Sequence, residues 1–115
     1  MQLSSETLAN GITRVALAGR LDIAGAREID VKFTTLTATK KAAVMVDLSA
    51  VDFIASIGIR TLLSGARGQA SRGGKMVLLQ PQSAVRGVLE TAGISSLIPI
   101  CDDAAAAESA LQGVL

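Results

Sequence analysis

The sequence predicts an α/β fold: a single domain with a mostly parallel central β-sheet, an antiparallel strand from an N-terminal hairpin, and about four flanking helices. Three observations predict it. Short apolar runs alternate with longer stretches in which apolar residues recur at helical spacing. An Asn-Gly pair separates the first two strand-like segments. Half of the 115 residues are hydrophobic, which is enough for one core spanning residues 1–115.

The N-terminal hairpin is predicted from the turn at Asn10 and Gly11, because these residues tolerate the positive φ angles of a tight turn. The flanking strands are expected at about 2–8 and 12–21. The second strand places alternate residues on one face, namely Val15, Leu17, Gly19 and Leu21.

A helix follows at about 25–38, and its apolar positions are Ala26, Ile29, Phe33 and Leu36. The unbroken apolar run at 43–48 predicts a central strand covered on both faces. The next helix is expected at 56–71, before Gly73 and Gly74, with the apolar stripe Ile59, Leu62, Leu63, Ala66 and Ala70.

The C-terminal part repeats the alternation. A strand at 75–80 ends at Pro81, and a helix at 83–93 turns Val85, Val88, Leu89 and Ala92 inward and ends at Gly93. A last strand at 96–101 is expected at a sheet edge, because Pro99 cannot donate a ladder hydrogen bond. Asp102 or Asp103 then caps a final helix at about 104–113.

Composition excludes several functions. The net charge of +1 gives no electrostatic case for nucleic acid or an acidic membrane. Without His, Trp or Tyr, base stacking and imidazole-dependent catalysis or metal binding are disfavoured. Cys101 is the single cysteine, so no internal disulfide can form. The chain also lacks a signal peptide and any apolar run of about 18 residues, so we expect a soluble cytoplasmic protein without membrane insertion.

Ser56 lies where an apolar strand ends and an apolar helix begins, in the segment "VDFIASIGIRTLL". One interpretation is an N-cap, whose hydroxyl accepts a hydrogen bond from the first turn of the helix. Another is a functional hydroxyl exposed at the carboxyl end of a parallel sheet, where a helix N-terminus tolerates added phosphate. Ile57 falls off the apolar stripe and is a candidate exposed contact.

Other candidate motifs have simpler explanations. The segment "GARGQASRGGK" lacks the spacing of a phosphate-binding loop, and we interpret Arg67, Arg72 and Lys75 as cations near a helix C-terminus. A Mg²⁺ site formed by Asp22, Asp47 and Asp52 is the alternative to roles as turn residues and caps. We expect no catalysis, no cofactor and no metal.

Four blocks together resemble the STAS domain of bacterial anti-sigma-factor antagonists. They are "AGRLDIAGA" (18–26), "VDLSAVDFIASIGIRTLL" (46–63), "GGKMVLLQP" (73–81) and "AVRGVLETAGI" (84–94), in the family's order and spacing over nearly the whole chain. The resemblance implies a STAS-like fold. It also implies a binding module that sequesters an anti-sigma factor, itself a serine kinase, and so regulates sigma-factor-dependent transcription.

In the family the kinase phosphorylates the antagonist on one residue, which matches Ser56 here, and a serine phosphatase reverses the reaction. Gly58 matches the family glycine that lets the partner's backbone approach. Asp22 and Ile23 fall where the partner surface continues. The implied partner-binding set is Asp22, Ile23, Ala55, Ser56, Ile57, Gly58, Ile59 and Arg60.

One position departs from the family pattern. The family usually has Asp directly before the acceptor serine, whereas this chain has Ala55. The departure leaves open a divergent partner, an antagonist that is never phosphorylated, or a variant sequence. It also gives weight to an alternative function, a constitutive STAS subunit of a lipid-transport ABC complex or of a signalling scaffold. The sequence does not define the oligomeric state.

Overall fold

The computed structural model describes residues 1–114 and contains a five-stranded sheet in the order β1-β2-β3-β4-β5. Strand β1 pairs antiparallel with β2, and every later neighbour is parallel. The strands are β1 (Gln2–Thr7), β2 (Thr13–Leu21), β3 (Ala43–Ile54), β4 (Lys75–Leu79) and β5 (Ile100–Cys101). The predicted fold class, its hairpin and its edge strand near Pro99 are confirmed.

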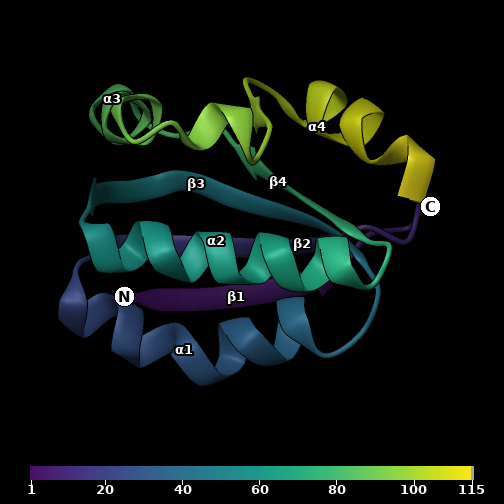
Figure 1. Ribbon diagram of the computed structural model, residues 1–115, viewed down its shortest axis with the longest axis horizontal. Coiled ribbons are helices and arrows are strands. Elements are labelled where there is room, and N and C mark those ends of the chain that lie inside the picture. Colours follow the sequence, from purple (N-terminus) through teal and green to yellow (C-terminus); the bar gives the residue numbers. More distant parts are fainter. Residues whose placement is uncertain (115) are drawn as a thin grey trace.

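Helices cover the sheet in two layers (Figure 1). Helices α1 and α2 pack against each other on one face, and α3 and α4 lie on the other. Their bounds are α1 (Ile23–Ala38), α2 (Ser56–Ser71), α3 (Ser83–Thr91) and α4 (Ala104–Leu111). Two single turns of 3₁₀-helix follow α3 and α4, at Ile94–Ser96 and Gln112–Val114.

The core forms two clusters of buried apolar side chains. The larger cluster joins β2, β3, α1, α2 and α3, and includes the fully buried Phe33, Leu48 and Leu62. The smaller cluster joins the sheet to α4 through residues such as Met45 and Leu111. Burial of both faces of β3 and β4 explains why these strands read as continuous apolar runs.

Strand β3 extends to Ile54, six residues beyond the predicted end. Its second half pairs with the end of β2 after two register shifts, which place Arg20 opposite Phe53 and Leu21 opposite Ile54. These irregularities break the alternation of buried and exposed residues, so sequence periodicity did not reveal this half of the strand.

The C-terminal elements also differ from the prediction. Only Ile100 and Cys101 pair as strand β5, because the chain before them turns through a 3₁₀-helix. In α3, Val88 is 41% exposed and Ala92 faces solvent, so only part of the predicted stripe is inward. Asp103 is the residue that caps α4, with its carboxylate accepting from the Ala106 N–H at 2.8 Å.

Candidate functional site

The predicted site residues meet at one end of the sheet, where β2 and β3 end and α1 and α2 begin (Figure 1). The backbone N–H of Ala55 donates to the Leu21 carbonyl at 3.0 Å and ties the two strand ends together. This bond places the segment Asp22–Ile23 beside the segment Ala55–Arg60. The carboxyl end of a parallel sheet is where open α/β folds present their functional residues.

Ser56 is the first residue of α2 and is exposed to solvent. The N-cap of the helix is Ala55, which has no side-chain oxygen to accept a hydrogen bond. The interpretation of Ser56 as the N-cap is therefore wrong, because the helix begins one residue earlier than that role requires. Within residues 1–114 the Ser56 hydroxyl has no hydrogen-bond role in the fold, and the hydroxyl is presented to solvent instead.

Asp22, by contrast, is the N-cap of α1. Its Oδ1 accepts from the Gly25 N–H at 2.8 Å, and its Oδ2 lies 3.6 Å from Arg20 Nε. The hydrogen bond from Gly25 lowers the pKa of the Asp22 carboxyl against the opposing effect of desolvation, and the Arg20 charge lowers it further. The Asp22 carboxylate thus caps α1, as one of the two interpretations of this residue predicted.

Arg20 and Phe53 are site neighbours that the sequence did not reveal. The Arg20 guanidinium lies over the Phe53 ring at 4.3 Å from its centroid, a cation–π contact across the paired ends of β2 and β3. Phe53 is 38% exposed and Ile23 is 60% exposed. The available signal was an aromatic residue three positions before Ser56, outside the strand predicted at 43–48.

Gly58 is buried rather than presented to a partner. A Cβ at this position would lie 2.6 Å from Leu21 Cγ and 2.8 Å from the Leu21 carbonyl oxygen. The residue is glycine because α2 packs directly on the end of β2. This corrects the expectation that Gly58 admits a partner's backbone.

Of the remaining predicted residues, Ile57 lies at a hollow between α1 and α2. Ile57 is half-buried, lines this hollow with Val31, and packs against the larger core cluster, so it is only partly the exposed contact expected. Ile59 also packs against the core. Arg60 is exposed, and Val31 is 77% exposed at the rim. The hollow has a volume of about 320 Å³.

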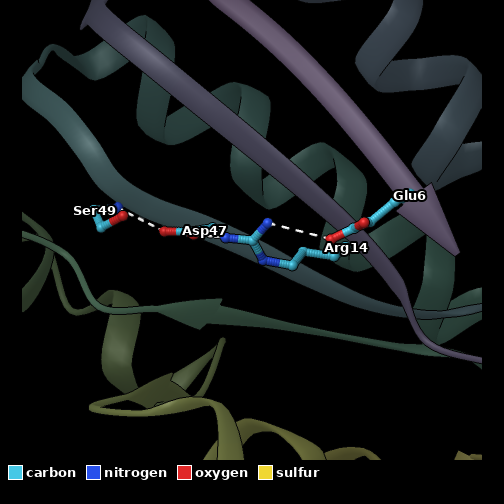
Figure 2. Close-up of polar contacts among 4 residues, drawn as sticks. All are labelled: Glu6, Arg14, Asp47 and Ser49. Carbon is cyan, nitrogen blue, oxygen red and sulfur yellow. Dashed lines mark hydrogen bonds and ion pairs between the residues drawn. The ribbon is translucent and has the colours of Figure 1, made fainter. Parts of the chain in front are cut away.

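Asp47 belongs to a separate polar network on β1, β2 and β3 (Figure 2). Its carboxylate pairs with Arg14 and accepts from the Ser49 N–H at 2.9 Å, while Arg14 also lies 3.5 Å from Glu6. Burial raises the pKa of the Asp47 carboxyl, but the Ser49 hydrogen bonds and the Arg14 charge outweigh it and hold the pKa below its usual value. Asp47 thus serves to join the strands.

Asp22 caps α1 and Asp47 pairs with Arg14, while Asp52, the third aspartate considered for Mg²⁺, is exposed on β3. Among residues 1–114, no three His, Cys, Asp or Glu side chains come close enough together to hold a metal ion. Of the predicted helix-terminal cations, Arg72 donates from Nη1 to the Gly68 carbonyl at 3.0 Å, near the C-terminus of α2. Over the same described range, no helix has the length and apolar character needed to span a membrane.

The geometry defines a small α/β domain with an unused hydroxyl at a helix start, flanked by exposed apolar side chains. Comparison with known proteins identifies its family. The family model described as "Mlab, STAS domain" matches residues 5–99. The chain belongs to the STAS-domain family.

Individual relatives are similar over almost their whole length. A Bordetella bronchiseptica protein named as an anti-sigma factor antagonist, BtrV, is 27% identical over 115 residues, covering 100% of this chain and 98% of that protein. An anti-sigma factor antagonist from Mycobacterium paratuberculosis has a TM-score of 0.86 at 22% identity, covering 96% of this chain and 93% of that one.

The Bacillus anti-sigma factor antagonist SpoIIAA is similar in two forms. The unphosphorylated form has a TM-score of 0.75 at 20% identity, covering 99% of both chains. The phosphorylated form has a TM-score of 0.67 at 20% identity, covering 99% of this chain and 100% of that one. These structural similarities confirm the fold.

Proposed function

We propose that this chain is an anti-sigma-factor antagonist, a non-enzymatic binding module that sequesters an anti-sigma factor in the cytoplasm and so regulates sigma-factor-dependent transcription. The observation that carries the proposal is Ser56. It is the first residue of α2, and its exposed hydroxyl does not cap the helix. Membership of the STAS family and the names of BtrV and SpoIIAA support it.

The proposed mechanism is occlusion at the site around Ser56. Unmodified Ser56, with Ile23 and Phe53 beside it, packs on the anti-sigma factor, which also acts as a serine kinase. Phosphorylation adds about two negative charges at a contact that must be desolvated, so the complex dissociates. A serine phosphatase would restore binding. The solved phosphorylated form of SpoIIAA supports a phosphate switch in this fold.

The test is the affinity of matched variants for the anti-sigma factor from the source organism. Ser56→Ala should bind like the unmodified protein, because alanine adds no charge at the contact and removes no hydrogen bond found among residues 1–114. Ser56→Asp should bind at least about tenfold more weakly, because a buried unpaired charge costs more than about 1.4 kcal/mol. Equal affinity of the two variants would rule out occlusion. Mapping of phosphate on Ser56 after incubation with the partner and ATP tests the kinase step.

A second candidate is a constitutive subunit of a lipid-transport ABC complex. The apolar Ala55, in place of the Asp that the family usually has before the acceptor serine, favours it. Co-purification of unmodified protein with a permease and an ATPase would support this function. Recovery of a kinase together with phosphate on Ser56 would support the antagonist.

A further inference from the structure

Charge is unevenly distributed along this chain. From residue 53 to residue 89 there is no acidic residue. The same stretch contains the cations Arg60, Arg67, Arg72, Lys75 and Arg86. The whole molecule has a net charge of +1, so this segment is a local excess of positive charge.

Helix α2 presents much of this charge on one face. Its buried residues are Gly58, Leu62, Gly65 and Gln69. The opposite, exposed face has residues at intervals of three and four, namely Ser56, Arg60, Ser64, Arg67 and Ser71. Apart from these, Ala70 is the other exposed residue of the helix, so the exposed side of α2 carries hydroxyls, guanidinium groups and one small apolar side chain. We call Arg60 and Arg67 on this face, together with Arg72 at the C-cap of the helix, the basic strip.

The charges of the strip are available to a ligand. Neither Arg60 nor Arg67 forms an ion pair with another of the described residues 1–114. Asp30 on α1 and Arg60 line a second hollow between α1 and α2, but the two are not paired. Arg72 uses Nη1 to bind the Gly68 carbonyl and remains exposed.

The C-terminal end of the strip is fixed by a buried side chain. Gln69 donates from Nε2 to the Thr37 and Lys40 carbonyls at 2.6 and 2.9 Å, and its Oε1 accepts from the Ala42 N–H at 2.8 Å. These bonds hold the loop with Lys40 and Lys41 against the end of α2. The fold therefore holds the backbone of Lys40 beside the C-terminal end of α2.

We propose that the basic strip is a docking surface for an acidic segment of the protein that binds at Ser56. The inference rests on the proposed function. Ser56 is the first residue of the same exposed face, so the strip continues the proposed partner site along α2. A phosphate on Ser56 would add negative charge one helical turn from Arg60 and repel the same acidic segment. The arginines of the strip would thus attract the acidic segment, and the phosphate on Ser56 would weaken that attraction.

Charge complementarity and continuity with Ser56 favour a protein occupant over a lipid surface. A membrane-binding face usually adds exposed apolar side chains to its cations. The large apolar residues that are exposed, Ile23, Val31, Phe53, Val88 and Leu97, all lie outside the strip. A purely polar strip matches the charged rim of a protein interface.

The first experiment measures affinity for the anti-sigma factor at about 0.05 M and about 0.5 M salt, because screening weakens exposed ion pairs. Arg67→Glu should weaken binding roughly threefold to tenfold at low salt and much less at high salt. The matched control is Lys32→Glu, an equal charge reversal on the exposed side of α1 that lines a hollow beside β1. Equal binding by Arg67→Glu and wild type would overturn the inference and leave the proposed function standing.

A second experiment does not depend on the anti-sigma factor. The full chain is titrated with a Glu-rich peptide and with its Gln-rich counterpart, and backbone amide shifts are followed. Shifts along residues 60–75 that require Glu and disappear in Arg60→Glu/Arg67→Glu support an acidic occupant. Equal shifts with both peptides would overturn it. Binding only to vesicles containing phosphatidylserine would also overturn it, in favour of a lipid surface. If the wild type does not bind the anti-sigma factor, the proposed function is wrong. The peptide titration then tests by itself whether the basic strip binds an acidic segment.

Discussion

Helices α1 and α2 begin side by side against the end of β2, and their first turns share a glycine but differ in their caps. The third residue of each helix is a glycine that packs on β2, Gly25 in α1 and Gly58 in α2. The residue before each helix differs. Asp22 caps α1 with its carboxylate, whereas Ala55 provides no cap for α2.

The difference separates a structural helix start from one that is free for function. The first four N–H groups of a helix have no partner within it, and a side-chain cap satisfies one of them. Asp22 does this for α1. Helix α2 leaves its first turn uncapped by any side chain and places an exposed serine there. Departures from local optima are expected where a site has a role beyond stability.

The largest effects should come from the two shared glycines. A Cβ on Gly25 would lie 2.0 Å from the Arg20 carbonyl oxygen, and one on Gly58 would lie 2.6 Å from Leu21 Cγ. Gly25→Ala and Gly58→Ala should each lower the free energy of unfolding by about 3 kcal/mol or more, because backbone atoms must move. Gly25→Ala should be the worse, since its nearest obstacle is a carbonyl oxygen. Chemical denaturation measures both.

The control for this pair is Gly87→Ala in the middle of α3. A Cβ there meets nothing within 4 Å. Alanine favours helix over glycine by about 0.5–1 kcal/mol, so this variant should be as stable as wild type or more so. Similar losses for all three variants would show that helix starts on β2 have no special packing.

Removing the cap of α1 and adding one to α2 should change the stability less, and in opposite directions. Asp22→Ala removes the acceptor for the Gly25 N–H and should lower the melting temperature by roughly 3–6 °C. Ala55→Asp supplies the missing acceptor to α2 and should raise the free energy of unfolding by about 0.5–1 kcal/mol. Thermal unfolding checks both. A destabilised Ala55→Asp would mean that the first turn of α2 cannot accept a cap.

Acidity tests the cap of α1 separately. The folded pKa of Asp22 lies below its unfolded value, so its stabilisation is complete above an unfolded pKa of about 3.9 and is lost as pH falls through the lower folded pKa. Asp22→Asn keeps an acceptor that does not titrate. Any stability advantage of wild type over Asp22→Asn should therefore shrink as pH falls below about 4. A gap that is constant with pH would exclude a role for the carboxylate charge.

The same contrast explains what the sequence could predict. The cap at Asp22 and the start of α2 at residue 56 follow from local patterns, and the structure has both. The Arg20–Phe53 contact depends on two register shifts between β2 and β3 that no periodicity encodes. The burial of Gly58 depends on Leu21, a residue of another element. Short-range rules therefore located the site, and long-range packing determined which of its residues face solvent.

The smallest effect on stability should come from Ser56 itself. Because its hydroxyl caps nothing, Ser56→Ala should change the free energy of unfolding by no more than about 0.5 kcal/mol, as for an ordinary surface substitution. Asp22→Ala, at the helix start beside it, should cause a clearly measurable loss. If Ser56→Ala lowered the free energy of unfolding as much as Asp22→Ala does, Ser56 would have to act as a helix cap. Equal stability would make any change in partner affinity or phosphorylation a direct effect of the hydroxyl rather than of unfolding.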